Sequence, residues 1–341
     1  MTDAAASAGN PGTIAIIGAG SMGRAHARAW AGAGLGDQVA YVCTTRGTTS
    51  LDDAPLAASV SDLDAVLADP AVGIVSVCTP TDTHADIAIR ALQAGKHVLL
   101  EKPIALTVDD AHLIRAQAAI SPGVLMVAHV VRFFGGYRAV REAAEAGTLG
   151  APLSVHAERL SGPPKPSPWW HDETRSGGVL VDFAIHDFDQ LNLFLGEPVT
   201  AFSRRGRPGG PIETTVDYAN GGLGHVVTSM GMPPGFSFSS SVEVLGATGL
   251  ASHRFVGSLD GSPSPQRLEA VGAGTESLAT TIDAGDPYVR QAEYFLDCIA
   301  TGSAPVWCPT DAAVTALAVA LAAQESLATG RPVPVTRTPT A

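Results

Sequence analysis

A carboxylate and an imidazole stand four positions apart in the apolar segment SGGVLVDFAIHD, residues 176–187. If a helix begins at Gly177-Gly178, the side chains of Asp182 and His186 lie one turn apart on the same face. An imidazole beside a carboxylate in an apolar wall can take or give one proton near neutral pH. The same spacing also fits a core helix with two internally satisfied polar side chains, so the rest of the chain must decide between these interpretations.

The elements that must position this pair fall into two parts. In residues 12–131, short apolar strands alternate with helices, which is typical of βαβ units around a parallel sheet. In residues 132–335, strand-like runs separated by Gly, Pro and Ser follow one another, which indicates a mostly antiparallel sheet. Helices interrupt this second part at about 178–195, 288–300 and 310–328. We expect residues 1–11 and 336–341 to be loose tails.

Composition excludes several classes of partner. At 341 residues the chain is long enough for two domains. Its formal net charge of −12 argues against nucleic acid or an anionic membrane surface as the main partner. The cysteines at positions 43, 78, 298 and 308 form no Cys-x-x-Cys pair, so neither a disulfide framework nor a metal site is indicated. The N-terminus does not resemble a signal peptide, and no uninterrupted apolar run approaches the roughly 20 residues of a membrane span. We therefore expect a cytoplasmic protein.

A glycine-rich loop directly follows the first predicted strand and opens the first helix. It reads Gly18-Ala-Gly20-Ser21-Met22-Gly23, which is the dinucleotide fingerprint in the context that it requires. Gly18 permits the tight turn, Gly20 lets the backbone approach a pyrophosphate, and Gly23 lets the helix pack closely on the sheet. The pyrophosphate would then rest on the N–H groups at the helix start. This loop predicts a Rossmann domain that binds a nicotinamide dinucleotide.

The end of the second predicted strand indicates which dinucleotide. NAD is usually held there by a carboxylate that binds the ribose 2′-hydroxyl. This chain has Cys43-Thr44-Thr45-Arg46 at that place, and the first carboxylate is Asp52. Two hydroxyls and a guanidinium suit a 2′-phosphate, so we expect NADP in preference to NAD. The alternative is that Arg46 is only a solvated turn residue.

Several further motifs occur in a fixed order along the chain. They are Cys78-Thr79-Pro80, His84, Glu101-Lys102-Pro103, Gly177-Gly178 with Asp182 and His186, and a C-terminal run over residues 318–333. With these motifs the chain resembles the Gfo/Idh/MocA family, of the glucose–fructose oxidoreductase and inositol 2-dehydrogenase type. The resemblance covers about residues 13–333. The Glu-Lys-Pro motif with the later Asp-x-x-x-His is far more specific than the glycine loop.

The resemblance implies an α/β Rossmann domain with a mostly parallel sheet, followed by an α+β domain with a large, mostly antiparallel open sheet. That open sheet commonly mediates homodimers or homotetramers. The resemblance also implies that Lys102, Asp182 and His186 are the catalytic residues beside the nicotinamide, and that Lys102 precedes a cis-proline. Further cofactor contacts are expected from Thr79, Pro80, His84 and Glu101. Without the other motifs, Lys102 would be a strand-end lysine paired to Glu101.

The residue types suit the oxidation of a carbinol. His186 is the best base, Asp182 can orient its ring, and Lys102 can bind the substrate oxygen and stabilise a developing alkoxide. Lys102 and His186 exchange the roles of acid and base in some relatives. We therefore expect an NAD(P)-dependent dehydrogenase or reductase acting on CH–OH groups. Its small-molecule substrate would be a sugar, an inositol-like polyol or a related hydroxylated ring.

Candidates on the substrate side are Arg132, Tyr137, Arg159 and Trp170, because aromatic and polar side chains suit a sugar ring. For Trp170 the alternative is that it packs its own loop. Two other functions remain open. One is a nicotinamide-dependent glycosidase of the same fold, and the other is a non-catalytic regulator that senses the dinucleotide.

Overall fold

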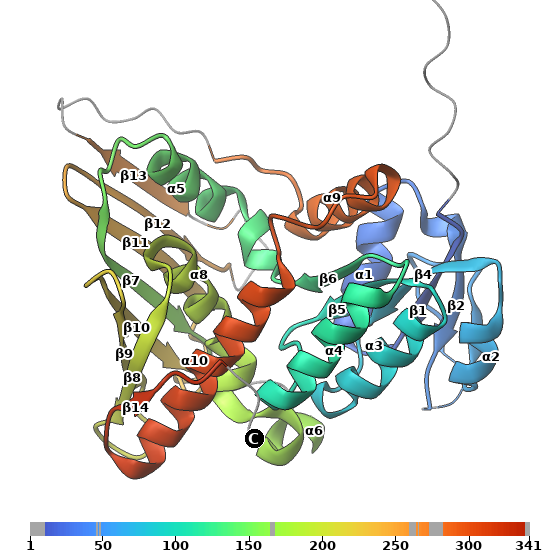
Figure 1. Cartoon of the computed structure of the whole chain (residues 1–341), viewed down its shortest axis with the longest axis horizontal. Helices are drawn as coiled ribbons and strands as arrows, with labels where there is room; N and C mark the ends of the chain where they lie inside the picture. The colour runs from blue at the N-terminus through green and yellow to red at the C-terminus, as the bar shows by residue number, and fades with distance from the viewer. Residues whose placement is uncertain are drawn as a thin grey trace, which may run out of the picture. The chain divides into compact units, whose positions relative to one another are not determined.

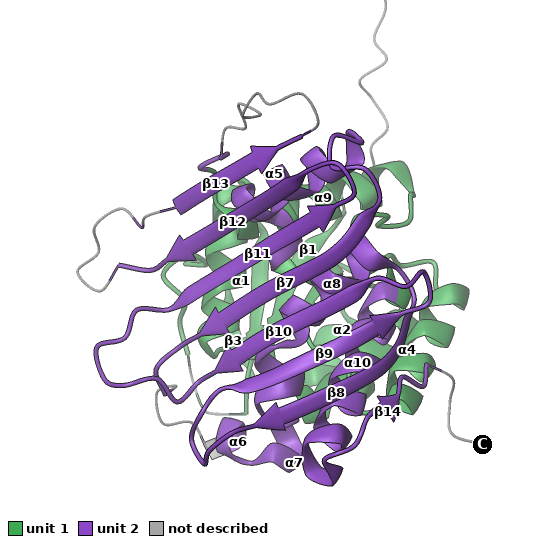
Figure 2. Ribbon diagram, turned by 90° about the vertical axis from the view of Figure 1, so that its left-hand side faces the viewer, with its two compact units in different colours: residues 1–130, 285–311 green, residues 131–284, 312–341 purple. Residues whose placement is uncertain are grey.

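The computed structural model describes residues 11–45, 47, 49–163, 168–258, 264, 266–272 and 282–337. Arg46 and most of the two expected tails lie outside these residues. The chain forms two compact units, shown in different colours in Figure 2. The first unit contains residues 1–130 and 285–311, and the second contains residues 131–284 and 312–341.

The first unit holds a six-stranded parallel sheet with the strand order β3-β2-β1-β4-β5-β6 (Figure 1). Its strands are β1 (Thr13–Ile17), β2 (Val39–Cys43), β3 (Ala58–Val60), β4 (Val72–Val77), β5 (His97–Glu101) and β6 (Leu125–Ala128). This order confirms the expected Rossmann topology. The short strand β3 was not expected, because three residues carry too little hydrophobic periodicity to be recognised. Strand β6 ends at Ala128 and is followed by a 3₁₀ turn, η3 (Val130–Phe133).

Helices connect these strands. They are α1 (Ser21–Gly32), α2 (Leu63–Ala68), α3 (His84–Gln93) and α4 (Val108–Ile120), with short 3₁₀ turns η1 (Gly36–Gln38) and η2 (Thr81–Thr83). The Thr107 hydroxyl accepts the Asp110 N–H at 3.1 Å and so caps α4. Right-handed connections place α1 and α3 on opposite faces of the sheet, because the strand order reverses between β1 and β4. The central strands β1, β4 and β5, together with β6, are therefore buried on both faces, whereas β3 is not.

One segment differs from the expected division of the chain. Helix α9 (Pro287–Thr301) lies within the second predicted part, but it packs against α1 of the first unit. The contact is close at Gly32, where an added Cβ would lie 2.5 Å from a methyl group of Val289. The expected division of the chain at residue 131 did not include this return of the chain to the first unit. Strand and helix periodicity do not show which sheet a helix covers.

The second unit holds an eight-stranded sheet with the order β13-β12-β11-β7-β10-β9-β8-β14. The strands are β7 (Pro152–Leu160), β8 (Pro198–Arg205), β9 (Ile212–Tyr218), β10 (Leu223–Ser229), β11 (Ser239–Gly246), β12 (Leu250–Val256), β13 (Gln266–Val271) and β14 (Val333–Pro334). Every pair is antiparallel except β7 with β10. The large, mostly antiparallel sheet is therefore confirmed.

Helices cover one face of this second sheet. Helix α5 (Gly135–Glu145) packs on β11, β12 and β13, and α8 (Ile185–Leu195) packs on β7, β10 and β11. Two single-turn helices, α6 (Pro168–His171) and α7 (Glu173–Ser176), precede α8. Side chains alternate between the buried and the outer face along each strand, as in β9, whose outward residues are Glu213, Thr215 and Asp217.

Helix α10 (Thr310–Thr329) is long and rich in apolar residues. It is the one helix among the described residues that is long and apolar enough to cross a membrane, with a mean hydropathy of 1.4 over its most apolar window. Thr315 and Gln324 interrupt its apolar residues, so the expectation that no uninterrupted apolar run approaches 20 residues is not contradicted. Because 56% of that window is buried inside the protein, α10 is a core helix whose apolar residues face protein on nearly all sides.

Candidate active site

The carboxyl ends of the parallel strands meet at one edge of the first sheet. Gly18 N–H bonds the Cys43 carbonyl, and Cys78 N–H bonds the Ile17 carbonyl, both at 2.8 Å. Lys102 directly follows β5, the neighbour of β4. The ends of β1, β2, β4 and β5 thus bring the glycine loop, Thr44, Thr79 and Lys102 to the edge where α/β sheets bind ligands.

The three glycines of the loop meet different surroundings. A Cβ added to Gly18, whose φ is +100°, would lie 2.6 Å from the Cys78 carbonyl oxygen. A Cβ at Gly23 would lie 2.0 Å from the Gly18 carbonyl oxygen. In contrast, a Cβ at Gly20 would have no neighbour within 4 Å. Gly18 and Gly23 are therefore required by close packing, whereas Gly20 leaves open the space through which a pyrophosphate would reach the start of α1.

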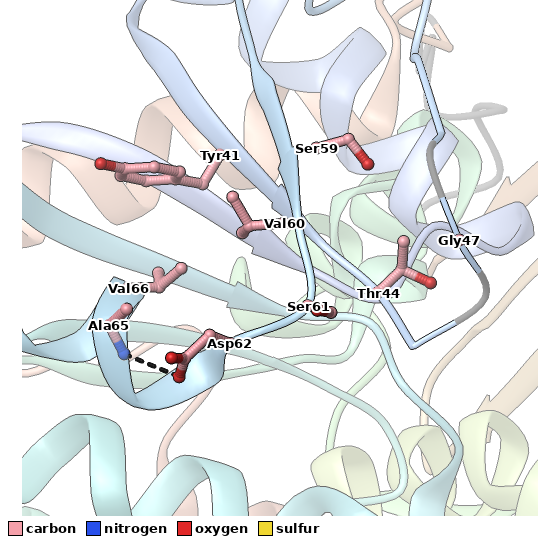
Figure 3. Close-up of a pocket in the computed structure, with 9 residues that line it drawn as sticks. All are labelled: Tyr41, Thr44, Gly47, Ser59, Val60, Ser61, Asp62, Ala65 and Val66. Atoms are coloured by element: carbon pink, nitrogen blue, oxygen red, sulfur yellow. Dashed lines mark hydrogen bonds between the residues drawn. The ribbon is translucent and has the colours of Figure 1, made fainter.

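A cavity of about 430 Å³ opens beside the ends of β2 and β3 (Figure 3). Hydroxyl groups dominate its polar lining, and its one carboxylate, Asp62, accepts the Ala65 N–H at 3.0 Å and caps α2. The lining residues are Tyr41, Thr44, Gly47, Ser59, Val60, Ser61, Asp62, Ala65 and Val66. The cavity lies where a Rossmann domain receives the adenosine ribose, so both the loop and this cavity fit a dinucleotide.

The carboxylate beside Lys102 belongs to a buried ion pair. Glu101 Oε1 lies 2.8 Å from His26 Nε2 on α1, and Glu101 Oε2 accepts the Lys102 N–H at 3.2 Å. In the simpler interpretation, the Lys102 side chain pairs with Glu101. That carboxylate already has His26 as a partner. His26 was not identified from the sequence, although its position three residues after Gly23 on the buried face of α1 could have indicated it.

His84 holds the turn on the other side of Lys102. Its Nδ1 lies 2.8 Å from the Pro103 carbonyl oxygen, and its Nε2 lies 3.0 Å from the Thr79 carbonyl oxygen. Burial lowers the pKa of His84. The Lys102–Pro103 peptide bond is cis, as expected. His84 thus ties together the segments that follow β4 and β5.

In the second unit, the segment that carries Asp182 and His186 is not one regular helix. Gly177 and Gly178 have φ values of +77° and +73°, so no helix begins there. Residues Val179–Phe183 form a π-helical turn, η4, in which Ala184 N–H bonds the Val179 carbonyl at 2.9 Å. Helix α8 begins at Ile185. The expected α-helical spacing of Asp182 and His186 is therefore wrong, because the extra residue of the π turn changes their relation.

Asp182 is held by the loop that precedes it. The indole N–H of Trp170 donates to Asp182 Oδ2 at 2.9 Å, and the Ser176 hydroxyl donates to the Trp170 carbonyl at 3.0 Å. Gln324 on α10 donates to the Gly177 carbonyl at 3.1 Å. Asp182 and His186 are both half-buried. The alternative interpretation of Trp170, a residue that secures its own loop, is thus supported by its contacts.

Two of the other substrate candidates form buried ion pairs with carboxylates that follow His186 on α8. The guanidinium of Arg159 binds Asp187 through two contacts of 2.9 Å, and that of Arg132 binds Asp189 at 2.7 and 2.6 Å. Burial lowers the pKa of Arg159, but Asp187 outweighs this effect and raises it. Both arginines thus anchor α8.

Tyr137, the remaining substrate candidate, is 2% exposed, and its ring lies edge-on to His253 with 5.4 Å between centroids. Burial raises the pKa of the Tyr137 hydroxyl. Like Arg132 and Arg159, this side chain lies among protein groups. Substrate binding by these three residues stays a prediction that their burial does not support.

Comparison with known proteins agrees with this architecture. Residues 13–129 match the family model described as "Oxidoreductase family, NAD-binding Rossmann fold", and residues 137–252 match the GFO/IDH/MocA C-terminal domain. The chain is 28% identical over 284 residues to a scyllo-inositol 2-dehydrogenase (NAD(+)) of Bacillus subtilis (strain 168), an alignment that covers 79% of each protein.

Solved structures share the fold. A levoglucosan dehydrogenase in complex with NADH and levoglucosan superposes with a TM-score of 0.78 at 23% identity, covering 96% of this chain and 99% of that one. GenD2 from gentamicin A biosynthesis, in complex with NAD, superposes with a TM-score of 0.75 at 26% identity, covering 95% and 96%. With both of its units matched to the same group of enzymes, the protein belongs to the GFO/IDH/MocA family of oxidoreductases.

Proposed function

We propose that the protein moves hydride between NADP(H) and a carbinol or carbonyl of a sugar, an inositol-like polyol or a related hydroxylated ring. The observation that carries this proposal is the strand-end edge of the first sheet. There, the open approach above Gly20 and the turn at Lys102 follow β1 and β5 of the same sheet. The relatives named for inositol and levoglucosan support the substrate class.

The proposed chemistry gives one role to each of three side chains. A bound nicotinamide supplies the hydride acceptor or donor. We assign Lys102 to bind the substrate oxygen and stabilise charge that develops on it, and His186 to take the hydroxyl proton. Asp182, fixed by Trp170, is assigned to orient His186. In the reverse direction, the same groups polarise a carbonyl and return the proton.

The preference for NADP rests on the cavity at the ends of β2 and β3. Residues 43–45 supply no carboxylate to bind a ribose 2′-hydroxyl, and Asp62 is engaged in capping α2. Hydroxyls of Thr44, Ser59 and Ser61 line the cavity. These groups, with the guanidinium that the sequence provides at Arg46, suit the three acceptor oxygens of a phosphate.

The function is tested by a panel of sugars and polyols with NADP and with NAD, followed by nicotinamide absorbance. We expect turnover with NADP and a member of the panel, and loss of that turnover in Lys102→Ala and His186→Ala while both variants still bind NADPH. Full turnover in either variant refutes the assigned roles. Hydrolysis of a glycoside without net cofactor reduction indicates the glycosidase instead, and tight cofactor binding without any turnover indicates the sensor.

We also propose that two copies associate through the outer face of the second sheet. No described element of this unit covers that face (Figure 2). Strand pairing aligns Leu223, Ser154, Leu245, Leu250 and Val271 in one mostly apolar row across it, and Leu223, Leu245 and Val271 are exposed. Exposed apolar rows of this kind mark association surfaces. Leu245→Asp is expected to lower the mass measured by sedimentation equilibrium to that of one chain, and an unchanged mass contradicts this interface.

A further inference from the structure

Helix α1 connects the glycine loop to two strands of the first sheet through buried side chains. His26 and Trp30 lie one turn apart on its buried face. Trp30 Nε1 donates to the Ser76 hydroxyl on β4 at 3.0 Å, and His26 Nε2 lies 2.8 Å from Glu101 Oε1 on β5. Both contacts are buried, and each joins α1 to a strand. Only the contact of His26 involves Glu101, the residue next to Lys102.

Both oxygens of the Glu101 carboxylate have partners within the first unit. Oε1 accepts from His26, and Oε2 accepts the backbone N–H of Lys102 at 3.2 Å. The His26 and Glu101 side chains are 2% and 5% exposed. Charge-assisted hydrogen bonds shielded from water are strong, and a buried ion pair of this kind keeps one geometry. The series of contacts from α1 through Glu101 to the Lys102 backbone is therefore short and rigid.

The charge state of His26 fits this arrangement. Burial alone lowers its pKa, but the Cys78 thiol and the Glu101 carboxylate outweigh burial and raise the pKa of His26 to about 10. The Glu101 carboxylate thus favours the imidazolium form of His26. Glu101 has its counter-charge on α1, so it does not require the ammonium group of Lys102 as its only partner.

We propose that His26 is a positioning residue for Lys102. It holds the Glu101 carboxylate, and Glu101 holds the backbone from which the Lys102 side chain starts. Because His26 and the glycine loop lie on the same helix, this contact sets Lys102 relative to the loop that receives the pyrophosphate. The consequence for turnover rests on the function proposed above for Lys102, whereas the positioning is a property of the first unit alone.

The backbone environment of Lys102 can be measured by NMR spectroscopy without a substrate. It contains three lysines, Lys96, Lys102 and Lys165, so selective ¹⁵N-lysine labelling gives three backbone amide signals. Loss of the Lys102 signal in Lys102→Arg assigns it. In His26→Leu we expect the Lys102 amide proton to shift and its exchange with solvent to accelerate at least about tenfold, because its acceptor loses its anchor. Lys96, whose amide bonds the Ala91 carbonyl at 3.0 Å, is the internal reference.

Two further variants separate positioning from general stability. Ser76→Ala breaks the matched Trp30 contact one turn along the same helix, so it should lower the melting temperature and leave the Lys102 signal in place. His26→Gln keeps an N–H donor at position 26, and the Lys102 signal should return toward that of the wild type. If His26→Leu does not fold, Glu101→Gln takes its place, because an amide oxygen accepts more weakly than a carboxylate.

Kinetics test the consequence for the reaction. At saturating cofactor, kcat should fall about tenfold in His26→Leu, since small displacements of a catalytic group are costly, while the Kd for NADPH changes less than about twofold. His26→Gln should recover most of kcat. In a Glu101→Gln background, His26→Leu should add no further loss, because His26 acts through Glu101.

Each outcome decides a separate point. An unchanged kcat in a variant whose Lys102 amide has moved refutes the role assigned to Lys102 in turnover, whereas an unmoved Lys102 amide in His26→Leu overturns the positioning proposal. A full additional loss of kcat in the Glu101→Gln background also overturns it. If the wild-type protein turns over no member of the panel, the proposed function fails, and the amide measurement still decides whether His26 positions Lys102.

Discussion

The buried pair of Arg159 and Asp187 predicts a large loss of stability from a change of few atoms. Asp187→Asn removes the negative charge and keeps the shape of the side chain. The guanidinium makes two contacts of 2.9 Å to this carboxylate, and the two side chains are 5% and 0% exposed. Asn can offer one oxygen in place of two, so a guanidinium stays buried without a counter-charge.

The expected magnitude follows from this burial. Breaking a buried ion pair by removing one partner costs about 3–5 kcal/mol. For a cooperative unit of 150–250 residues, 1 kcal/mol lowers the melting temperature by roughly 2–4 °C. Asp187→Asn should therefore lower the melting temperature by roughly 6–20 °C in differential scanning calorimetry. Because His186 directly precedes Asp187, turnover at a permissive temperature should also fall.

Two variants serve as controls for this prediction. Glu142→Gln breaks the exposed helical pair with Arg138, whose side chains are 25% and 57% exposed, and such pairs contribute at most about 0.5 kcal/mol. Replacing both partners, Arg159→Met with Asp187→Leu, removes the uncompensated charge and should recover much of the loss. If Asp187→Asn melts within about 2 °C of the wild type, the reasoning from burial is wrong.

Three other predictions concern the first unit. Gly20→Ala should fold normally and bind NADPH at least about tenfold more weakly, because its methyl group enters the open approach to the start of α1. Gly23→Ala should instead lower the melting temperature sharply, because its methyl group clashes with the backbone. Equal melting temperatures of the two variants refute this contrast. The pKa of His26 is raised above its unfolded value near 6.5 to about 10, so its contribution to stability is complete below pH 6.5 and is lost as the pH rises through 10. The difference in melting temperature between the wild type and His26→Gln should accordingly shrink from pH 6.5 to pH 10, and a constant difference contradicts the assigned charge. Arg46→Ala should weaken NADPH binding by about tenfold or more and NADH binding hardly at all, as measured by nicotinamide fluorescence. Equal losses of affinity for NADPH and NADH indicate that Arg46 is a turn residue without a role in selectivity.

Local patterns in the sequence were sufficient for most of the fold. The apolar run of β1 followed by glycines, the Thr107 cap of α4, and the alternation in β7 each depend on residues that are close in sequence. The patterns failed where the structure depends on distant contacts. Helix α9 reads like any amphipathic helix, and its place beside α1 is decided by packing of Val289 at Gly32, more than 250 positions away in the chain.

The candidate site was predictable where a residue type is dictated by backbone geometry. Gly18 and Gly23 are required by contacts that exclude a Cβ, and a fingerprint records such requirements directly. Charge pairing is less visible in a sequence. Arg132 and Arg159 have the residue type that binds a polar substrate, and nothing in the local pattern shows that Asp189 and Asp187 already occupy them. Exposed and buried arginines cannot be distinguished by type alone.

The π turn at residues 179–183 changes how the pair of Asp182 and His186 is to be understood. Their spacing of four suggested that one helix face holds both, but each is fixed by different contacts. Asp182 is held by the Trp170 indole, and His186 lies in the first turn of α8, whose residues Asp187 and Asp189 are anchored by arginines on β7 and η3. A π turn at such a place is common at functional sites. It lets Asp182 and α8 be held by separate contacts, so a substitution that removes the Trp170 indole should loosen Asp182 and leave the arginine anchors of α8 in place.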